Sequence, residues 1–166
     1  MAMKYKIVGY GSIMSHKSLR ETVPDKRFEP VIVKGYKRIF DIVQHKSDVL
    51  NLEKSKGHSF NGVMFTVNAE QLKELKKRES GYNLEKVWAY AFPSNKRLYQ
   101  CSLFVDHCVA IDKQHLKPQN GYFKLCREAA YHISKDFGKM WDDTTYVSNG
   151  RTVASWIKKN KTYNSK

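Results

Sequence analysis

Residues 6–14 constrain the fold more than any other stretch of the chain. They read Lys-Ile-Val-Gly-Tyr-Gly-Ser-Ile-Met, an apolar run that ends in glycines on either side of Tyr10. The apolar start is typical of a buried strand, and Gly9 and Gly11 let the backbone turn and approach another group closely. Such a loop can point backbone N–H groups at an anion. We therefore expect a strand that leads into a tight loop, which is either a ligand cradle or a plain turn.

Better-known glycine motifs are excluded at this loop. A dinucleotide fingerprint needs a third glycine where the chain has Met14. A nucleophile elbow centred on Ser12 needs glycines where Tyr10 and Met14 stand. The loop therefore indicates neither a dinucleotide cofactor nor a serine hydrolase.

The composition predicts one domain with a substantial core. The chain has 166 residues, of which 41% are hydrophobic, and we expect a single domain over residues 1–157 followed by a basic C-terminal tail over residues 158–166. No apolar stretch approaches the roughly 20 residues that span a membrane, and the N-terminus lacks the pattern of a secretory signal. A cytoplasmic protein is expected. Cys101, Cys108 and Cys126 form no C-x-x-C pair, so neither a disulfide framework nor a zinc site is indicated.

The charge is strongly positive. Lys and Arg number 30 against 16 Asp and Glu, a net charge of +14, which favours anionic partners without identifying a fold. The basic residues are spread along the chain, and no helix-turn-helix, zinc-finger or aromatic RNA-binding signature accompanies them. A solvated basic surface and a polyanion-binding surface are both compatible with this pattern.

Strand patterns dominate the first two thirds of the chain and helical patterns the last third, which predicts an α+β fold with a mainly antiparallel or mixed sheet curled around a core. Strands are expected over residues 6–9, 31–43 with a bend at Gly35, 59–67, 84–92 and 98–105, and a short edge strand over residues 108–111. Residues 48–60 are too polar to assign beyond an irregular excursion or a weak hairpin. A short helix is expected from Ser15.

A second helix is predicted over residues 69–79. Asn68 and Gln71 have the spacing of a capping box, and Gly81 is placed to end the helix. Local hydrogen bonds therefore specify both ends of this element.

Glu79 lies on the apolar face of that helix, in register with Leu72 and Leu75. Burial there would raise the pKa of the carboxyl group, as a general acid or base near neutral pH requires. The alternative is a frayed last turn with Glu79 in solvent or paired with a lysine. Glu74 is better explained by a surface ion pair with Arg78, four residues on.

The C-terminal third predicts further helices. One helical stripe runs from Tyr122 to Phe137, with Gly138 closing the helix. Asp142 and Asp143 are expected to be solvated or capping, and Thr152 to cap a final helix.

Several segments together resemble the gamma-glutamylcyclotransferase-like (AIG2-like) family. They are Gly-Tyr-Gly-Ser at 9–12, Gly-Val-Met-Phe at 62–65, Glu-Ser-Gly-Tyr at 79–82, Asn-Gly-Tyr-Phe at 120–123, Thr-Thr-Tyr at 144–146 and Asn-Gly-Arg-Thr at 149–152. Their order and spacing cover nearly the whole chain, and the combination is more specific than any one of them.

The resemblance implies a small mixed or antiparallel β-barrel with flanking helices and a pocket at one end. It implies that Glu79 is the catalytic acid and base. The residues implied to hold the substrate's α-carboxylate are Tyr10, Gly11, Ser12 and Ile13, and those implied to form pocket walls are Tyr82 and Tyr122.

The implied reaction closes a γ-glutamyl group to 5-oxoproline and releases an amine or amino acid, with neither metal nor cofactor. Ile13 departs from the asparagine of the mammalian-type enzymes, which leaves open whether the small-molecule substrate is a γ-glutamyl amino acid, a γ-glutamylamine or glutathione. Other hypotheses stay open. They are a non-catalytic relative that binds a small carboxylate, a polyanion or nucleic-acid binder, and a related aminolysis with a different leaving group.

Overall fold

A computed structural model describes residues 3–105 and 111–163. Its strands are β1 (Lys4–Gly9), β2 (Glu29–Gln44), β3 (Ser47–Asn68), β4 (Asn83–Ala91), β5 (Arg97–Val105) and β6 (Thr145–Val147). Its α-helices are α1 (His16–Leu19), α2 (Ala69–Arg78), α3 (Asn120–Ile133), α4 (Lys135–Thr144) and α5 (Val153–Trp156). Three short 3-10 helices are η1 (Ser12–Met14), η2 (Ile157–Lys159) and η3 (Lys161–Tyr163).

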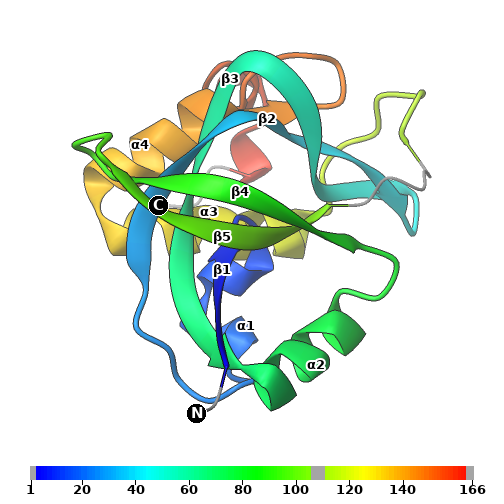
Figure 1. Cartoon of the computed structure of the whole chain (residues 1–166). Coiled ribbons are helices and arrows are strands. Elements are labelled where there is room, and N and C mark those ends of the chain that lie inside the picture. The colour runs from blue at the N-terminus through cyan, green and yellow to red at the C-terminus, as the bar shows by residue number, and fades with distance from the viewer. Residues whose placement is uncertain (1–2, 106–110, 164–166) are drawn as a thin grey trace.

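The strands form one mixed sheet in the order β3-β1-β5-β4-β2-β6 (Figure 1). All pairings are antiparallel except β1 with β5 and β2 with β6. Because β2 also pairs with β3, the ring of pairings closes through β3, β1, β5, β4 and β2. The predicted α+β fold with a curled, mainly antiparallel sheet is confirmed.

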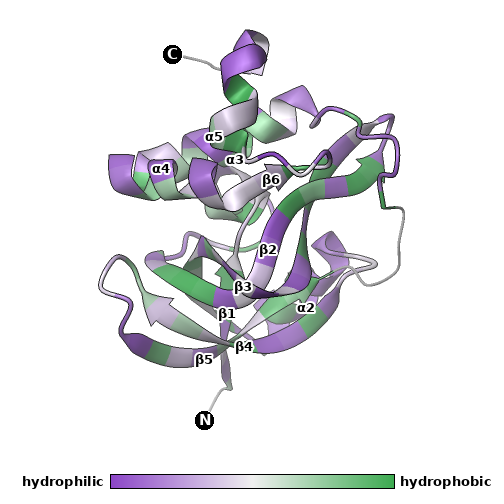
Figure 2. Ribbon diagram, turned by 90° about the horizontal axis from the view of Figure 1, so that it is seen from above, coloured by the Kyte–Doolittle hydropathy of each residue, from purple (hydrophilic) through white to green (hydrophobic). Residues whose placement is uncertain are grey.

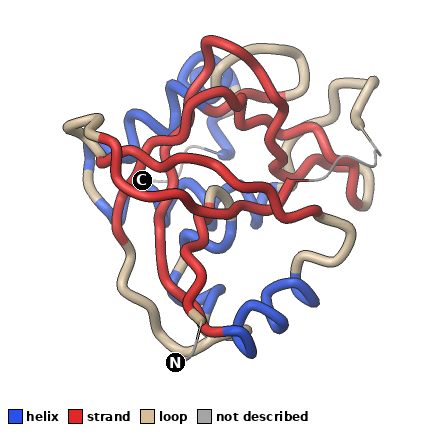
Figure 3. Tube along the Cα trace, viewed as in Figure 1, coloured by secondary structure: helices blue, strands red, loops and turns tan. Residues whose placement is uncertain are grey.

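The longest strands, β2 and β3, form a continuous hairpin that runs through most of the molecule (Figure 3). The bend predicted at Gly35 is confirmed, since the register shifts between Lys34 and Tyr36 and Gly35 has a φ of +89°. Residues 48–60, where only an irregular excursion or a weak hairpin was expected, belong to β3, with a bulge where residues 55–58 fall outside the register with β2 and Gly57 has a φ of +90°. At the start of this stretch the polar pattern was misleading, because Gln119 donates a backbone hydrogen bond to the Asp48 carbonyl at 2.9 Å and the side chains of Asp48 and Asn51 are buried.

Helices α3, α4 and α5 gather on the side of the molecule away from β4 and β5 (Figure 2). The single helix predicted up to Gly138 is wrong, because the chain leaves helical geometry at Ser134, where φ is −170°. Ser134 then caps α4 by accepting a hydrogen bond from the Phe137 backbone N–H at 3.0 Å. Gly138 therefore lies inside α4 and does not end a helix.

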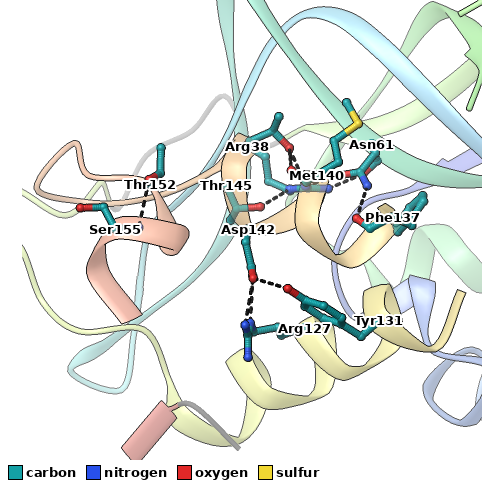
Figure 4. Close-up of polar contacts among 11 residues, drawn as sticks. Arg38, Asn61, Arg127, Tyr131, Phe137, Met140, Asp142, Thr145, Thr152 and Ser155 are labelled. Atoms are coloured by element: carbon teal, nitrogen blue, oxygen red, sulfur yellow. Dashed lines mark hydrogen bonds and ion pairs between the residues drawn. The ribbon is translucent and has the colours of Figure 1, made fainter. Parts of the chain in front are cut away.

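A fully buried arginine joins α4 to the hairpin (Figure 4). Arg38 donates from Nε to Thr145 Oγ1 at 2.7 Å and from Nη2 to Asn61 Oδ1 at 2.7 Å. Asn61 in turn donates to the Phe137 carbonyl at 2.8 Å. Because a buried charge must be hydrogen-bonded to be tolerated, this network holds the helical layer in one orientation against the sheet.

Asp142 is buried, so the expectation that it is solvated or capping is wrong. Its carboxylate accepts from Arg127 Nε at 2.8 Å and Nη2 at 2.9 Å, and from the Tyr131 hydroxyl at 2.5 Å (Figure 4). The partners lie on α3, so these bonds tie the two helices together.

The C-terminal residues add to the core. Tyr163 is buried, packs against Trp156 with ring centroids 4.8 Å apart, and donates from its hydroxyl to the Pro118 carbonyl at 2.9 Å. The basic segment from residue 158 thus contains a packed aromatic side chain, and the domain boundary at residue 157 stays a prediction.

Some expectations fall outside the described residues. Cys108 and most of the edge strand expected over residues 108–111 lie there, while Ile111 forms an isolated bridge with Ile42. Cys101 and Cys126 are free and buried. Within residues 3–105 and 111–163, none of the helices has the length and apolar character needed to cross a membrane.

Candidate active site

A cavity of about 210 Å³ opens where β1 ends, between the loop into η1, the end of α2 and the start of α3. Every residue predicted for the site lines it, namely Tyr10, Gly11, Ser12, Ile13, Glu79, Tyr82 and Tyr122. These residues come from segments far apart in the chain, and the sheet and α2 bring them to one end of the molecule. The functional roles of these residues stay predictions.

Close packing around the glycine loop explains why this stretch needs glycine. A Cβ on Gly11 would lie 2.7 Å from the Tyr122 hydroxyl oxygen, and a Cβ on Gly62 would lie 2.5 Å from the Gly9 carbonyl oxygen. Tyr10 donates from its hydroxyl to the Phe104 carbonyl at 2.6 Å, so its ring is fixed as a wall of the cavity. The loop is therefore held rigidly against β3 and α3.

Glu79 lies at the C-terminal end of α2, in the C-cap position, with 19% of its side chain exposed. The predicted capping box is present, with Asn68 Oδ1 accepting from the Gln71 backbone N–H at 2.8 Å. The helix ends one residue earlier than predicted, and Gly81 follows with a φ of +91°. Glu79 at this turn lines the cavity.

Burial raises the pKa of Glu79, and the adjacent Arg78 guanidinium opposes that shift. Arg78 Nε lies 3.7 Å from Glu79 Oε1. The opposing effects leave a carboxyl group that is more easily protonated than one in water, next to a fixed positive charge.

Arg78 is the site residue that the sequence did not reveal. Its guanidinium donates to the Ser18 carbonyl at 2.6 Å, to Ser18 Oγ at 2.6 Å and to Ser12 Oγ at 3.1 Å. The surface pair predicted between Glu74 and Arg78 is wrong, because Glu74 pairs with Lys77 at 3.1 Å instead. The only local signal for Arg78 was its position next to Glu79, since its hydrogen-bond partners lie some 60 residues away in sequence.

The tyrosines of the cavity differ in their environments. Burial raises the pKa of Tyr122 well above its ordinary value, and nearby Cys126 and the other ionisable side chains of the cavity add to the shift. Tyr122 is therefore a neutral phenol at physiological pH, able to donate a hydrogen bond. Tyr82 donates from its hydroxyl to the Leu50 carbonyl at 3.3 Å, which ties the turn after α2 to the hairpin.

The cavity therefore combines one proton-exchanging carboxyl group with phenols, a guanidinium and a tight backbone loop. Such a set suits binding of a small carboxylate and proton transfer next to it. Among the described residues, no three His, Cys, Asp or Glu side chains are grouped as metal ligands would be.

The ChaC-like protein family model matches residues 5–152. A solved structure named gamma-glutamyl cyclotransferase superposes with a TM-score of 0.71 at 16% identity, covering 95% of this chain and 99% of that chain. An uncharacterized protein from Homo sapiens superposes with a TM-score of 0.71 at 16% identity, covering 98% and 99%. YkqA from Bacillus subtilis gives 0.65 at 18% identity, covering 82% of this chain and 52% of that one. No curated protein sequence matches the chain significantly.

Proposed function

The chain belongs to the ChaC-like protein family, and from this membership and the cavity at the end of β1 we propose that it is a gamma-glutamyl cyclotransferase-type enzyme. The reaction would convert a γ-glutamyl group into 5-oxoproline and release an amine or amino acid. The observation that carries the proposal is that the largely buried Glu79 and the glycine loop line the same cavity of about 210 Å³. The fold shared with a structure named gamma-glutamyl cyclotransferase agrees with it.

Proton transfer by Glu79 is the centre of the proposed mechanism. The backbone amides of residues 10–13 would hold the substrate's α-carboxylate, which places its α-ammonium beside Glu79. Glu79 would accept a proton from the α-ammonium, and the free amine would attack the γ-carbonyl carbon. The new C–N bond closes the ring, the original γ-amide C–N bond breaks as Glu79 returns its proton to the departing nitrogen, and the ring nitrogen passes its second proton to the released amine.

The expected rate contributions are ordinary for such a site. A positioned carboxylate contributes roughly 10² to 10⁴ in rate by proton transfer, and holding the amine against the carbonyl supplies a proximity effect. The raised pKa of Glu79 suits a group that must both accept and return a proton near neutral pH.

Arg78 would act as a positioning residue in this mechanism. Its hydrogen bonds to Ser12 and Ser18 join the glycine loop to the helix end that carries Glu79. The same guanidinium limits how far burial raises the pKa of Glu79. Because its donors already serve these bonds, we assign Arg78 to site geometry and not to direct binding of a carboxylate.

The test is release of 5-oxoproline, measured by mass spectrometry, from γ-glutamyl amino acids, γ-glutamylamines and glutathione. We expect wild type to release it from at least one class and Glu79→Gln, which keeps shape and loses the titrating group, to lose at least 100-fold in kcat. Glu74→Gln, on the exposed face of the same helix, is the matched control and should keep full activity. Retained turnover in Glu79→Gln would refute the role of Glu79.

The assay also separates the competing hypotheses. A folded wild type that releases nothing but binds a γ-glutamyl compound would favour the non-catalytic relative. Polyanion binding would instead weaken steeply with added salt, whereas turnover in a half-buried cavity should be much less sensitive.

A further inference from the structure

A second and larger hollow lies on the other side of the loop that follows β1. It has a volume of about 780 Å³ and shares no lining residue with the proposed active-site cavity. One bank is the face of α3 from Leu125 to Ile133, and the other is made by residues 14–17, residues 26–28 and Pro30. We refer to it as the α3 groove.

The floor of the α3 groove is apolar. The side chains that form it are Met14, Phe28, Pro30, Leu125, Ala129 and Ile133. The Phe28 ring is stacked by His16 with centroids 3.9 Å apart and planes 12° from parallel, which makes a flat wall. The floor residues are partly or wholly buried, so an occupant would contact a preformed apolar surface.

The charged side chains around the floor are distributed unequally between the two banks. The bank opposite α3 carries Lys17, Lys26 and Arg27, while α3 contributes the single acidic residue, Glu128. Lys26 donates to Gln71 Oε1 at 2.8 Å, which fixes it at the edge of the groove. Lys17 and Arg27 are exposed and supply positive charge at the same bank.

We propose that the α3 groove binds a small amphipathic carboxylate, with its apolar body along α3 and its acid group at Lys17 and Arg27. A volume of about 780 Å³ lies within the roughly 300–1,000 Å³ of small-molecule sites, which are mainly apolar with a few polar groups at one side. The α3 face from Leu125 to Ile133 is about 12 Å long at 1.5 Å per residue, which suits a medium-length chain. The positive charges of this bank complement the single negative charge of a carboxylate, whereas a neutral ligand would give them no partner.

The test uses decanoate and its neutral counterpart decanamide as probes. Each is titrated below its aggregation concentration into ¹⁵N-labelled full-length protein, and backbone amide shifts are followed by NMR. We expect saturable decanoate binding with shifts concentrated at residues 14–17, 26–28 and 125–133, and at least tenfold weaker binding of decanamide.

Two variants test the groove and its charge separately. Lys17→Glu/Arg27→Glu should weaken decanoate binding at least tenfold, whereas Lys158→Glu/Lys159→Glu, exposed on η2 with the same change in net charge, should leave it unchanged. Ala129→Phe fills the floor and should weaken both probes, and its amide spectrum reports whether the fold is kept.

Several outcomes would overturn the proposal. The first is a set of amide shifts that do not saturate or that map to the Glu79 cavity. The second is equal affinity for decanoate and decanamide. The third is an equal loss of decanoate affinity in the Lys158→Glu/Lys159→Glu control. Saturable binding of acidic peptides with no binding of decanoate would likewise replace the small carboxylate with a protein partner.

Discussion

Gly138→Ala should destabilise the protein, although helix propensity alone predicts the reverse. Gly138 lies within α4, where alanine is favoured over glycine by about 1 kcal/mol. A Cβ built there would lie within 2.6 Å of three atoms of the Tyr131 ring on α3. Ordinary contacts between carbon atoms are nearer 3.5–4.0 Å, so the ring or the helix must move by about an ångström.

The Tyr131 ring is poorly able to move, which sets the size of the effect. Its hydroxyl donates to Asp142 at 2.5 Å, and the Arg127 guanidinium lies 4.9 Å from its centroid. Overpacking costs about 1–3 kcal/mol, and a weakened hydrogen bond to a charged group adds about 1.5 kcal/mol or more. After the helix-propensity gain, we expect a net loss of about 2–3 kcal/mol in the free energy of unfolding.

Urea unfolding followed by far-UV circular dichroism measures this loss, and a double-mutant cycle assigns it. In a Tyr131→Ala background the clash is absent, so Gly138→Ala should be neutral or stabilising by up to about 1 kcal/mol. Gly121→Ala on α3 is the control, because its Cβ would meet nothing closer than 3.6 Å. The reasoning is refuted if Gly138→Ala raises stability in the wild type, or changes it equally in both backgrounds.

Three further predictions concern charged groups. Arg78→Met removes the charge that opposes the burial effect on Glu79, so the pKa of Glu79 should rise further. The acidic limb of the kcat/KM profile against pH should then move to higher pH, and Arg78→Lys should move it less. An unchanged profile would exclude this role for Arg78. Burial raises the pKa of Asp48 to about 8, and the nearby Asp112 carboxyl group adds to the shift. The folded state therefore holds a proton that the unfolded state releases, and stability should fall as pH rises from about 4 to 8. The urea-unfolding midpoint of the wild type should drop between pH 5 and pH 8, and Asp48→Asn should remove most of that drop. An equal drop in the variant would contradict the prediction. Asp142→Asn removes the negative charge from a bidentate pair and should lower the urea-unfolding free energy by about 2–3 kcal/mol, and a loss no larger than that of the exposed Asp143→Asn would contradict the prediction.

The parts of the fold that could be predicted are those that neighbouring residues specify. The capping box of Asn68 and Gln71, and the cap that Thr152 provides by accepting from the Ser155 backbone N–H at 3.2 Å, involve groups three residues apart. Their hydrogen bonds form within one turn of chain, so spacing alone reveals them. The strand before the glycine loop was predicted from another local signal, its run of apolar residues.

The predictions that failed depend on contacts distant in sequence. The apolar helical stripe continues through Ser134 and hid the local cap that Ser134 provides for α4, and only the packing of α4 on α3 shows why Gly138 is needed beside Tyr131. Asp142 has the local pattern of a surface residue, yet Arg127 on another helix makes its burial favourable.

By itself, the sequence determined the α+β class, the strand and glycine loop at residues 6–14, and the helix that presents Glu79, because periodicity and capping are local. It also indicated which residues line the candidate site, through motifs whose order matches a family. Only the tertiary structure decided that Arg78 joins that helix to Ser12 and Ser18, how far Glu79 is buried, and that a second, basic-rimmed groove lies along α3. These properties depend on which distant segments pack together and exclude water, and the local sequence pattern does not show which segments those are.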